Sequence, residues 1–169
     1  KATVHRSFIE KQNEDPIIVV SGLPRSGTSM MMQMLKAGGI KIYSDAVRKP
    51  DDNNPKGYYE HENVKSLKRN KKWLSETKGK AVKIISHLLN HLPSKFKYKI
   101  IFMNRDIDEV ILSQQKMLNK DTKNYPMSLS NAYKRNLENI KGWATNTPNI
   151  DILYVDYAGI ISNPTVEIK

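Results

Sequence analysis

The chain has no cysteine among its 169 residues. That absence excludes a disulfide framework and any metal site built on thiolates, and it is compatible with a reducing compartment. The chain also has no apolar run near the roughly 20 residues that a membrane-spanning helix requires. Its N-terminal residues lack the apolar core of a signal peptide. We therefore expect a soluble, cytoplasmic protein with no membrane span.

Acidic residues are few, with 17 Asp and Glu against 28 Lys and Arg, so the formal net charge is +11. A basic balance can serve nucleic acid, an anionic membrane surface or a small polyanionic ligand. It can equally reflect lysines spread over solvated faces, and only residues 68–72 form a tight cluster. The alternation of aromatic residues and lysines over 96–99 fits the solvated start of a strand better than a nucleic-acid contact. We do not expect a nucleic-acid partner.

Length and composition suit one globular domain, because 38% of the residues are hydrophobic and 27% are charged. No initiator methionine is present, and residues 163–169 resemble the opening of a helix that is cut off. We therefore expect residues 1–169 to form a single domain that is incomplete at its C-terminus.

Short apolar runs alternate with segments of helical spacing along the chain. Strands are predicted at 16–21, 40–43, 81–86, 98–103 and 150–155. Helices are predicted from the loop after the first strand to 38–39, from 104 to about 118, and across 129–144, with a further helix beginning within 58–62 and polar helix and connection over 63–80. This alternation predicts an α/β fold with three layers, a parallel sheet and a P-loop-type nucleotide-binding core. Ligands of such sheets gather beyond the carboxyl ends of the strands.

The glycine-containing loop at 21–29 joins the first strand to the first helix. Gly22, Gly27 and Ser29 match the phosphate-binding pattern G-x-x-x-x-G-K-[ST], but Thr28 stands where the lysine belongs. Such a loop binds anions because its backbone N–H groups turn inward and the following helix adds the positive end of its dipole. An ordinary strand-to-helix turn is the alternative. The agreement of strand, loop and helix favours a phosphate cradle that has lost its lysine.

Other polar residues also follow predicted strands. Arg105 ends one strand, and Asp106 and Glu109 are spaced as a capping box for the next helix. Ser113 lies on the same flank of that helix as Asp106, so we expect it to share a ligand with Arg105. Since His87 and Asp156 also follow strands, both could reach the same edge of the sheet.

A long polar stretch over 44–57 separates the second predicted strand from Tyr58, Tyr59, Glu60, His61 and Glu62. Long connections of this kind are often lids or binding segments. Two aromatic residues beside two carboxylates and a histidine make the end of this stretch a candidate for chemistry near the mouth of the sheet.

These residues resemble the sulfotransferases that use 3′-phosphoadenosine 5′-phosphosulfate (PAPS). The run from Pro24 to Ser29 fits that family's loop, which reads like P-[KR]-S-G-T-[TS], and looks most like the bacterial and tyrosylprotein-type branches. A strand-ending arginine with a serine eight residues later grips the donor's 3′-phosphate in the family, and Arg105 and Ser113 match that spacing. The stretch from Tyr154 to Pro164 resembles a later family segment.

The resemblance implies transfer of a sulfuryl group from PAPS to an acceptor hydroxyl or amine, with adenosine 3′,5′-bisphosphate (PAP) as the product. No metal is needed, and no lysine, because no triphosphate is handled. Arg25 is expected to stabilise the leaving phosphate. The residues expected to bind the donor are Gly22, Pro24, Arg25, Ser26, Gly27, Thr28, Ser29, Arg105 and Ser113.

The family takes the acceptor's proton with a histidine or a glutamate, which leaves two main candidates for the general base. His87, in Ser86-His87-Leu88, resembles the family's Thr-His-Leu, although Ile85 replaces the family's lysine and the nearest lysine is Lys83. Glu60 resembles the glutamate of the carboxylate-using branches. Asp45 and Glu62 are outside choices, which we expect to be surface or capping residues. The family's C-terminal loop that closes over the donor does not appear in the sequence.

Two other functions fit parts of the sequence. One is a P-loop kinase or other ATP-binding protein with a substituted lysine, which would bind ATP with magnesium. The other is a basic nucleic-acid-binding domain, which gives the loop no purpose. The sequence leaves the acceptor open among carbohydrates, lipids, small-molecule hydroxyls and tyrosine.

Overall fold

The computed structural model describes residues 15–45, 47–120, 125 and 127–163. Its sheet has five strands in the order β2-β3-β1-β4-β5, and every neighbouring pair is parallel. The strands are β1 (Ile17–Gly22), β2 (Lys41–Tyr43), β3 (Lys80–Lys83), β4 (Tyr98–Asn104) and β5 (Ile150–Asp156). The predicted α/β fold with a parallel sheet is confirmed.

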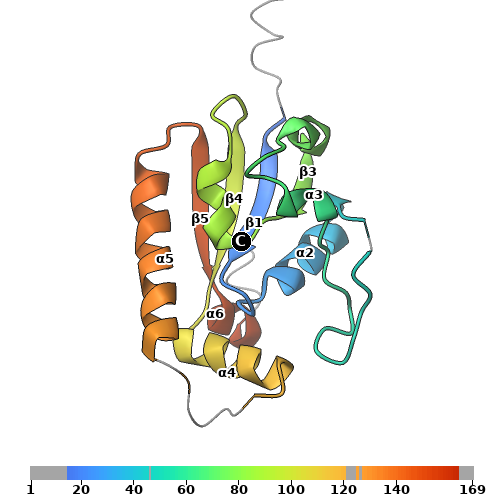
Figure 1. Cartoon of the computed structure of the whole chain (residues 1–169). Helices are drawn as coiled ribbons and strands as arrows, with labels where there is room; N and C mark the ends of the chain where they lie inside the picture. Colours follow the sequence, from blue (N-terminus) through green and yellow to red (C-terminus); the bar gives the residue numbers. More distant parts are fainter. Residues whose placement is uncertain (1–14, 46, 121–124, 126, 164–169) are drawn as a thin grey trace, which may run out of the picture.

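Helices connect the strands and cover the sheet (Figure 1). The α-helices are α2 (Thr28–Ala37), α3 (Glu62–Lys65), α4 (Ile107–Met117), α5 (Met127–Thr145) and α6 (Tyr157–Ser162). Two 3₁₀-helices, η1 (Lys72–Thr77) and η2 (Ser86–His91), flank β3 in the chain. Figure 1 shows α4 and α6 gathered at the end of the sheet where β1 leads into its loop.

The central strands are apolar on both faces because each face carries its own hydrophobic core. Val19 and Phe102 belong to a core that includes Ile140 of α5. Val20 belongs to the opposite core, with Met32 of α2 and Ile160 of α6 among its members. Burial on both sides is what a continuous apolar run in a parallel strand predicts. It fixes β1 in the middle of the sheet and places the loop after it at the sheet's carboxyl edge.

One predicted boundary was wrong. The strand predicted over 81–86 ends at Lys83, because after the hydrogen bond from Ile84 N to Val20 O the chain turns into η2. The helix predicted to begin within 58–62 begins at the last residue of that stretch, Glu62. Tyr59 takes a left-handed φ of 54°, and the carbonyl of Tyr58 accepts hydrogen bonds from side chains.

The segment over 63–80, predicted as polar helix and connection, contributes buried apolar side chains to the core. It contains only the short helices α3 and η1, with turns between them. Leu67, Trp73 and Leu74 are nonetheless fully or almost fully buried and belong to the core on the α5 side of the sheet. Because these residues are irregularly spaced along the chain, hydrophobic periodicity does not reveal that they belong to the core. The segment supports the sheet beneath β2 and β3.

Candidate active site

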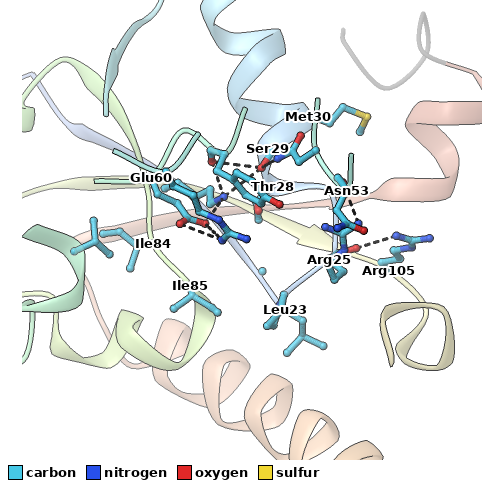
Figure 2. A pocket seen from close by; sticks show the side chains of 18 of the residues that line it. Leu23, Arg25, Thr28, Ser29, Met30, Asn53, Glu60, Ile84, Ile85 and Arg105 are labelled. Atoms are coloured by element: carbon cyan, nitrogen blue, oxygen red, sulfur yellow. Dashed lines mark hydrogen bonds and ion pairs between the residues drawn. The ribbon is translucent and has the colours of Figure 1, made fainter. Parts of the chain in front are cut away.

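A cavity of about 470 Å³ opens beyond the carboxyl ends of β1, β3 and β4. Its walls come from the loop after β1, the segment over 48–60, and the residues that follow β3 and β4. Figure 2 shows Arg25 and Arg105 on one side of this cavity and Glu60, Ile84 and Ile85 on the other. The topology therefore brings the predicted loop, Glu60 and Arg105 to one place.

The loop after β1 is held in a shape that its glycines make possible. A Cβ on Gly22 would lie 2.8 Å from the Met103 carbonyl oxygen. Gly27 has a left-handed φ of 96°, and a Cβ there would lie 2.5 Å from a ring carbon of Tyr157. Arg25 also takes a left-handed φ, of 67°, which is a costly conformation for a residue with a side chain. The loop thus combines close backbone approach with local strain.

The N-terminus of α2 lies at the cavity and has no side-chain cap. Thr28 and Ser29 line the cavity, and Gly27 at the N-cap offers no side-chain hydrogen bond to the first turn. No acidic residue stands in that turn. The first amides of a helix have no partner within the helix, and the dipole makes that end positive. This end of α2 therefore favours an anion.

Ser26 occupies a different place from the other predicted loop residues. Its side chain is buried and does not line the cavity. Its Oγ has no hydrogen-bond partner within the described part of the chain, and its backbone N donates to the Leu23 carbonyl at 3.2 Å. Gly22, Pro24, Arg25, Gly27, Thr28 and Ser29 all line the cavity.

Arg105 follows β4 and reaches back to the loop. Its Nη1 donates to the Arg25 carbonyl at 2.8 Å, its Nε donates to Glu109 at 3.0 Å, and its guanidinium lies 4.4 Å from the centre of the Tyr157 ring. Asp106 caps α4 by accepting from two backbone amides, as predicted. Arg105 is thereby fixed at the cavity with three independent contacts.

Ser113 contacts the other arginine of this wall. Arg25 Nε donates to Ser113 Oγ at 3.0 Å, and Arg25 Nη2 donates to the Asn53 carbonyl at 3.3 Å. Sequence spacing predicted that Ser113 shares a ligand with Arg105, and it did not predict the hydrogen bond that Arg25 makes to Ser113. The Arg25 side chain points toward α4, while its backbone carbonyl holds Arg105.

Lys83 is a cavity residue to which sequence reasoning assigned no role. Its ammonium donates to the Tyr58 carbonyl at 2.6 Å and to Ser29 Oγ at 3.2 Å, and lies 3.2 Å from Glu60 Oε1. Burial lowers the pKa of Lys83 below its usual 10.5, and the Glu60 carboxylate opposes that shift. A lysine at the last position of a buried parallel strand is the signal that could have identified it.

Described residues of the polar stretch over 44–57 contribute contacts to the cavity. Arg48 Nη1 lies 3.3 Å from each Glu60 carboxylate oxygen, and its guanidinium carbon lies 3.3 Å from the centre of the Tyr58 ring. Asn54 donates to Ser29 Oγ at 3.0 Å. Together with the hydrogen bond between Arg25 and the Asn53 carbonyl, these contacts place residues 48, 53 and 54 along the cavity wall between the loop and Glu60.

Three other predicted residues lie apart from this group. His87 is exposed on η2 and does not line the cavity. Partial desolvation of its imidazole, followed by the nearby charge of Lys68, lowers its pKa. Asp45 accepts hydrogen bonds from the Glu62 and Val47 amides, and the Glu62 bond lowers the pKa of Asp45. Asp156 caps α6 by accepting from Gly159 N at 2.7 Å. The last two carboxylates thus have local structural partners.

Within the described ranges, no three His, Cys, Asp or Glu side chains are grouped so that they could hold a metal ion. No helix among those residues is long and apolar enough to cross a membrane. Four cations and a carboxylate, Arg25, Arg48, Lys83, Arg105 and Glu60, are the charged groups argued above for the cavity. This set suits a polyanionic ligand and a proton transfer beside it.

Comparison with known proteins gave one family match. The family described as "Sulfotransferase domain" matches residues 15–169. No curated protein matches the chain.

Proposed function

Since the chain belongs to the sulfotransferase domain family, we propose that it transfers a sulfuryl group from PAPS to an acceptor hydroxyl. Sulfuryl transfer is the general property of that family. PAPS as the donor, and the roles of the individual residues, are the finer parts of the proposal.

The residues of the cavity fit a donor with phosphates at two positions. The free amides at the start of α2 and the strained, glycine-dependent loop suit a 5′-phosphate. Arg105, held at the loop by the Arg25 carbonyl, can offer its remaining donors to a 3′-phosphate, which ATP lacks. Arg25 lines the cavity, and its hydrogen bond to Ser113, which is not a lining residue, holds it toward α4.

When bound, PAPS supplies the sulfuryl group and leaves as PAP, with the electron pair of the broken sulfur–oxygen bond on its 5′-phosphate. The chain's contribution is positive charge placed before the reaction where that negative charge grows. Arg25 was the expected cation, and Lys83 joins it in this proposal because its ammonium contacts Ser29 at the start of α2. Both side chains line the cavity.

Glu60 is the general base of this proposal. It lines the cavity beside Lys83, whereas the His87 side chain is exposed and stands outside the lining. A base must lie within hydrogen-bond reach of the proton that it accepts. A Glu60 oxygen would accept the hydroxyl proton while the acceptor oxygen bonds to sulfur, so the protons and charges balance.

The observation that carries the proposal is one shared cavity. The anion-binding end of α2, the strand-ending Arg105, and the Lys83 and Glu60 pair all open onto it. An ATP-binding protein would need a site for magnesium as well, and a nucleic-acid-binding domain would have no use for a buried lysine beside a carboxylate.

Isothermal titration calorimetry with PAP and with ATP, each in EDTA and in magnesium, tests the proposal. PAP is expected to bind in EDTA with undiminished affinity, and ATP is expected to bind weakly under both conditions. Magnesium-dependent ATP binding with no binding of PAP would overturn the proposal in favour of an ATP-binding protein.

A further inference from the structure

Arg48 stands at the mouth of the cavity with its guanidinium stacked on the Tyr58 ring. Its side chain is 44% exposed. Within the described part of the chain, the Arg48 side chain donates hydrogen bonds from Nη1 to the two carboxylate oxygens of Glu60. Stacking on Tyr58 can hold the guanidinium in place while its other donors face a ligand.

Both oxygens of Glu60 are engaged by cations. Arg48 contacts the two oxygens, and Lys83 lies 3.2 Å from Oε1. A carboxylate in this state has few lone pairs left for the proton of an acceptor hydroxyl. A second anion at Arg48 would compete with Glu60 for the guanidinium and would free an oxygen of Glu60 for that proton.

The wall next to Glu60 is apolar. Figure 2 shows Ile84 and Ile85 below Glu60, across from Arg25 and Arg105, and Val64 and Leu88 also line the cavity. A neutral sugar would lose the water partners of several hydroxyls against such a wall, because buried polar groups without hydrogen bonds are costly. A flat apolar molecule with few polar groups would not carry this cost.

We propose that the acceptor is an acidic phenol, in which the aromatic body packs on the apolar wall, the hydroxyl reaches Glu60 and an anionic group binds Arg48. This inference rests on the proposed sulfotransferase function and names its acceptor class. Arg48 lies 3.3 Å from each Glu60 oxygen. With ordinary hydrogen bonds at both ends, the hydroxyl and the anionic oxygen therefore lie at most about 9 Å apart.

Arg48 is better suited to this role than the other cations of the cavity. Arg25, Lys83 and Arg105 are held by Ser113, by Ser29 and by Glu109, on the side assigned to the donor. Lys65 also lines the cavity, but its ammonium forms an ion pair with Glu62 at 2.7 Å on the exposed surface. Lys65 is therefore the matched control for removing a positive charge from the same cavity.

The test uses two nearly isosteric phenols, 3-hydroxyphenylacetate and the uncharged 3-hydroxyphenylacetamide. Each is titrated by calorimetry into protein saturated with PAP, so that binding is measured with no reaction taking place. The wild-type protein is expected to bind the acid about tenfold more tightly than the amide, as suits a hydrogen bond to a charged group. Arg48→Met is expected to reduce that preference to less than about threefold, and Lys65→Met to keep it.

PAP affinity, measured first on each variant, separates the two proposals. If PAP fails to bind the wild-type protein, the proposed function fails and the acceptor inference falls with it. If PAP binds and the acid shows no preference over the amide, or neither phenol binds, only the acceptor inference is overturned. Retention of the preference in Arg48→Met also overturns it, and unchanged PAP affinity in that variant shows that the fold and donor site survive.

Tighter binding of glucose 6-sulfate than of the acidic phenol would point to a sulfated carbohydrate instead and would overturn the aromatic part of the inference.

Discussion

The Lys83 ammonium lies 3.2 Å from Glu60 Oε1 in a largely buried position. The same ammonium donates to Ser29 at the start of α2, so one cation joins the anion-binding end of the helix to the proposed base. In the proposed function, this relationship divides the cavity into a donor side and an acceptor side. It also gives Lys83 a double role, since it can neutralise charge on a donor phosphate and hold Glu60 in position.

The first prediction concerns the titration of Lys83. Burial lowers the pKa of this ammonium below 10.5, so it loses its proton at a lower pH than an exposed lysine. The phosphates of PAP are fully ionised well above their second pKa of about 6. PAP affinity is therefore expected to fall as the pH rises through the lowered pKa of Lys83, within a window that ends below 10.5.

Lys83→Met provides the comparison for this pH effect. Its PAP affinity should be lower at pH 7 and should change little over the window in which the wild-type protein loses affinity. Calorimetric titrations from pH 7 upward measure both proteins. A wild-type profile as flat as that of the variant would show that the Lys83 charge does not contact the donor.

The second prediction separates the two candidate bases. Glu60→Gln removes the proton acceptor but keeps a side chain of similar shape, so turnover should fall by about 100-fold or more, as expected for loss of a general base. His87→Ala should leave turnover within about twofold, because His87 does not line the cavity. Release of PAP with a reactive acceptor is the measurement. A large loss in His87→Ala with little change in Glu60→Gln would reverse the assignment.

The third prediction concerns the loop backbone. Gly27→Ala places a Cβ 2.5 Å from the Tyr157 ring at a φ of 96°. We expect it to lower the free energy of unfolding by about 1–3 kcal/mol and to weaken PAP binding, because Tyr157 also stacks on Arg105. Chemical denaturation and calorimetry measure the two effects.

Gly142→Ala is the matched control for that substitution. Gly142 lies in α5, and a Cβ there meets nothing within 4 Å. Because alanine is a better helix former than glycine, this change is expected to stabilise the protein by up to about 1 kcal/mol and to leave PAP affinity unchanged. Equal effects of the two substitutions would show that the loop has no special need for glycine.

The sequence predicted those parts of the site whose signals are local. The order of strand, loop and helix around Gly22 and Gly27, the cap at Asp106 and the position of Arg105 after a strand are all set by neighbouring residues. The fold class follows from the same alternation of apolar runs and helical spacing. In these cases the physical cause lies within a few residues of the feature.

The features that the sequence did not reveal depend on contacts across the chain. Arg25 meets Ser113, 88 positions away, and Lys83 meets Tyr58 and Glu60 only because β3 ends beside them. Arg48 reaches Glu60 from a segment with no periodic pattern. No spacing rule encodes such meetings, because the sheet order and the course of a loop decide them.

The central claim is that the donor site binds a nucleotide with both a 5′- and a 3′-phosphate. Its most direct test compares the affinities of PAP and adenosine 5′-monophosphate for the wild-type protein and for Arg105→Ala. The wild-type protein is predicted to bind PAP at least about tenfold more tightly than the monophosphate, because charged hydrogen bonds to the 3′-phosphate are lost with the latter. Arg105→Ala should bind the two with affinities within about threefold of each other. Equal affinities in the wild-type protein, or an undiminished preference for PAP in Arg105→Ala, would contradict the account.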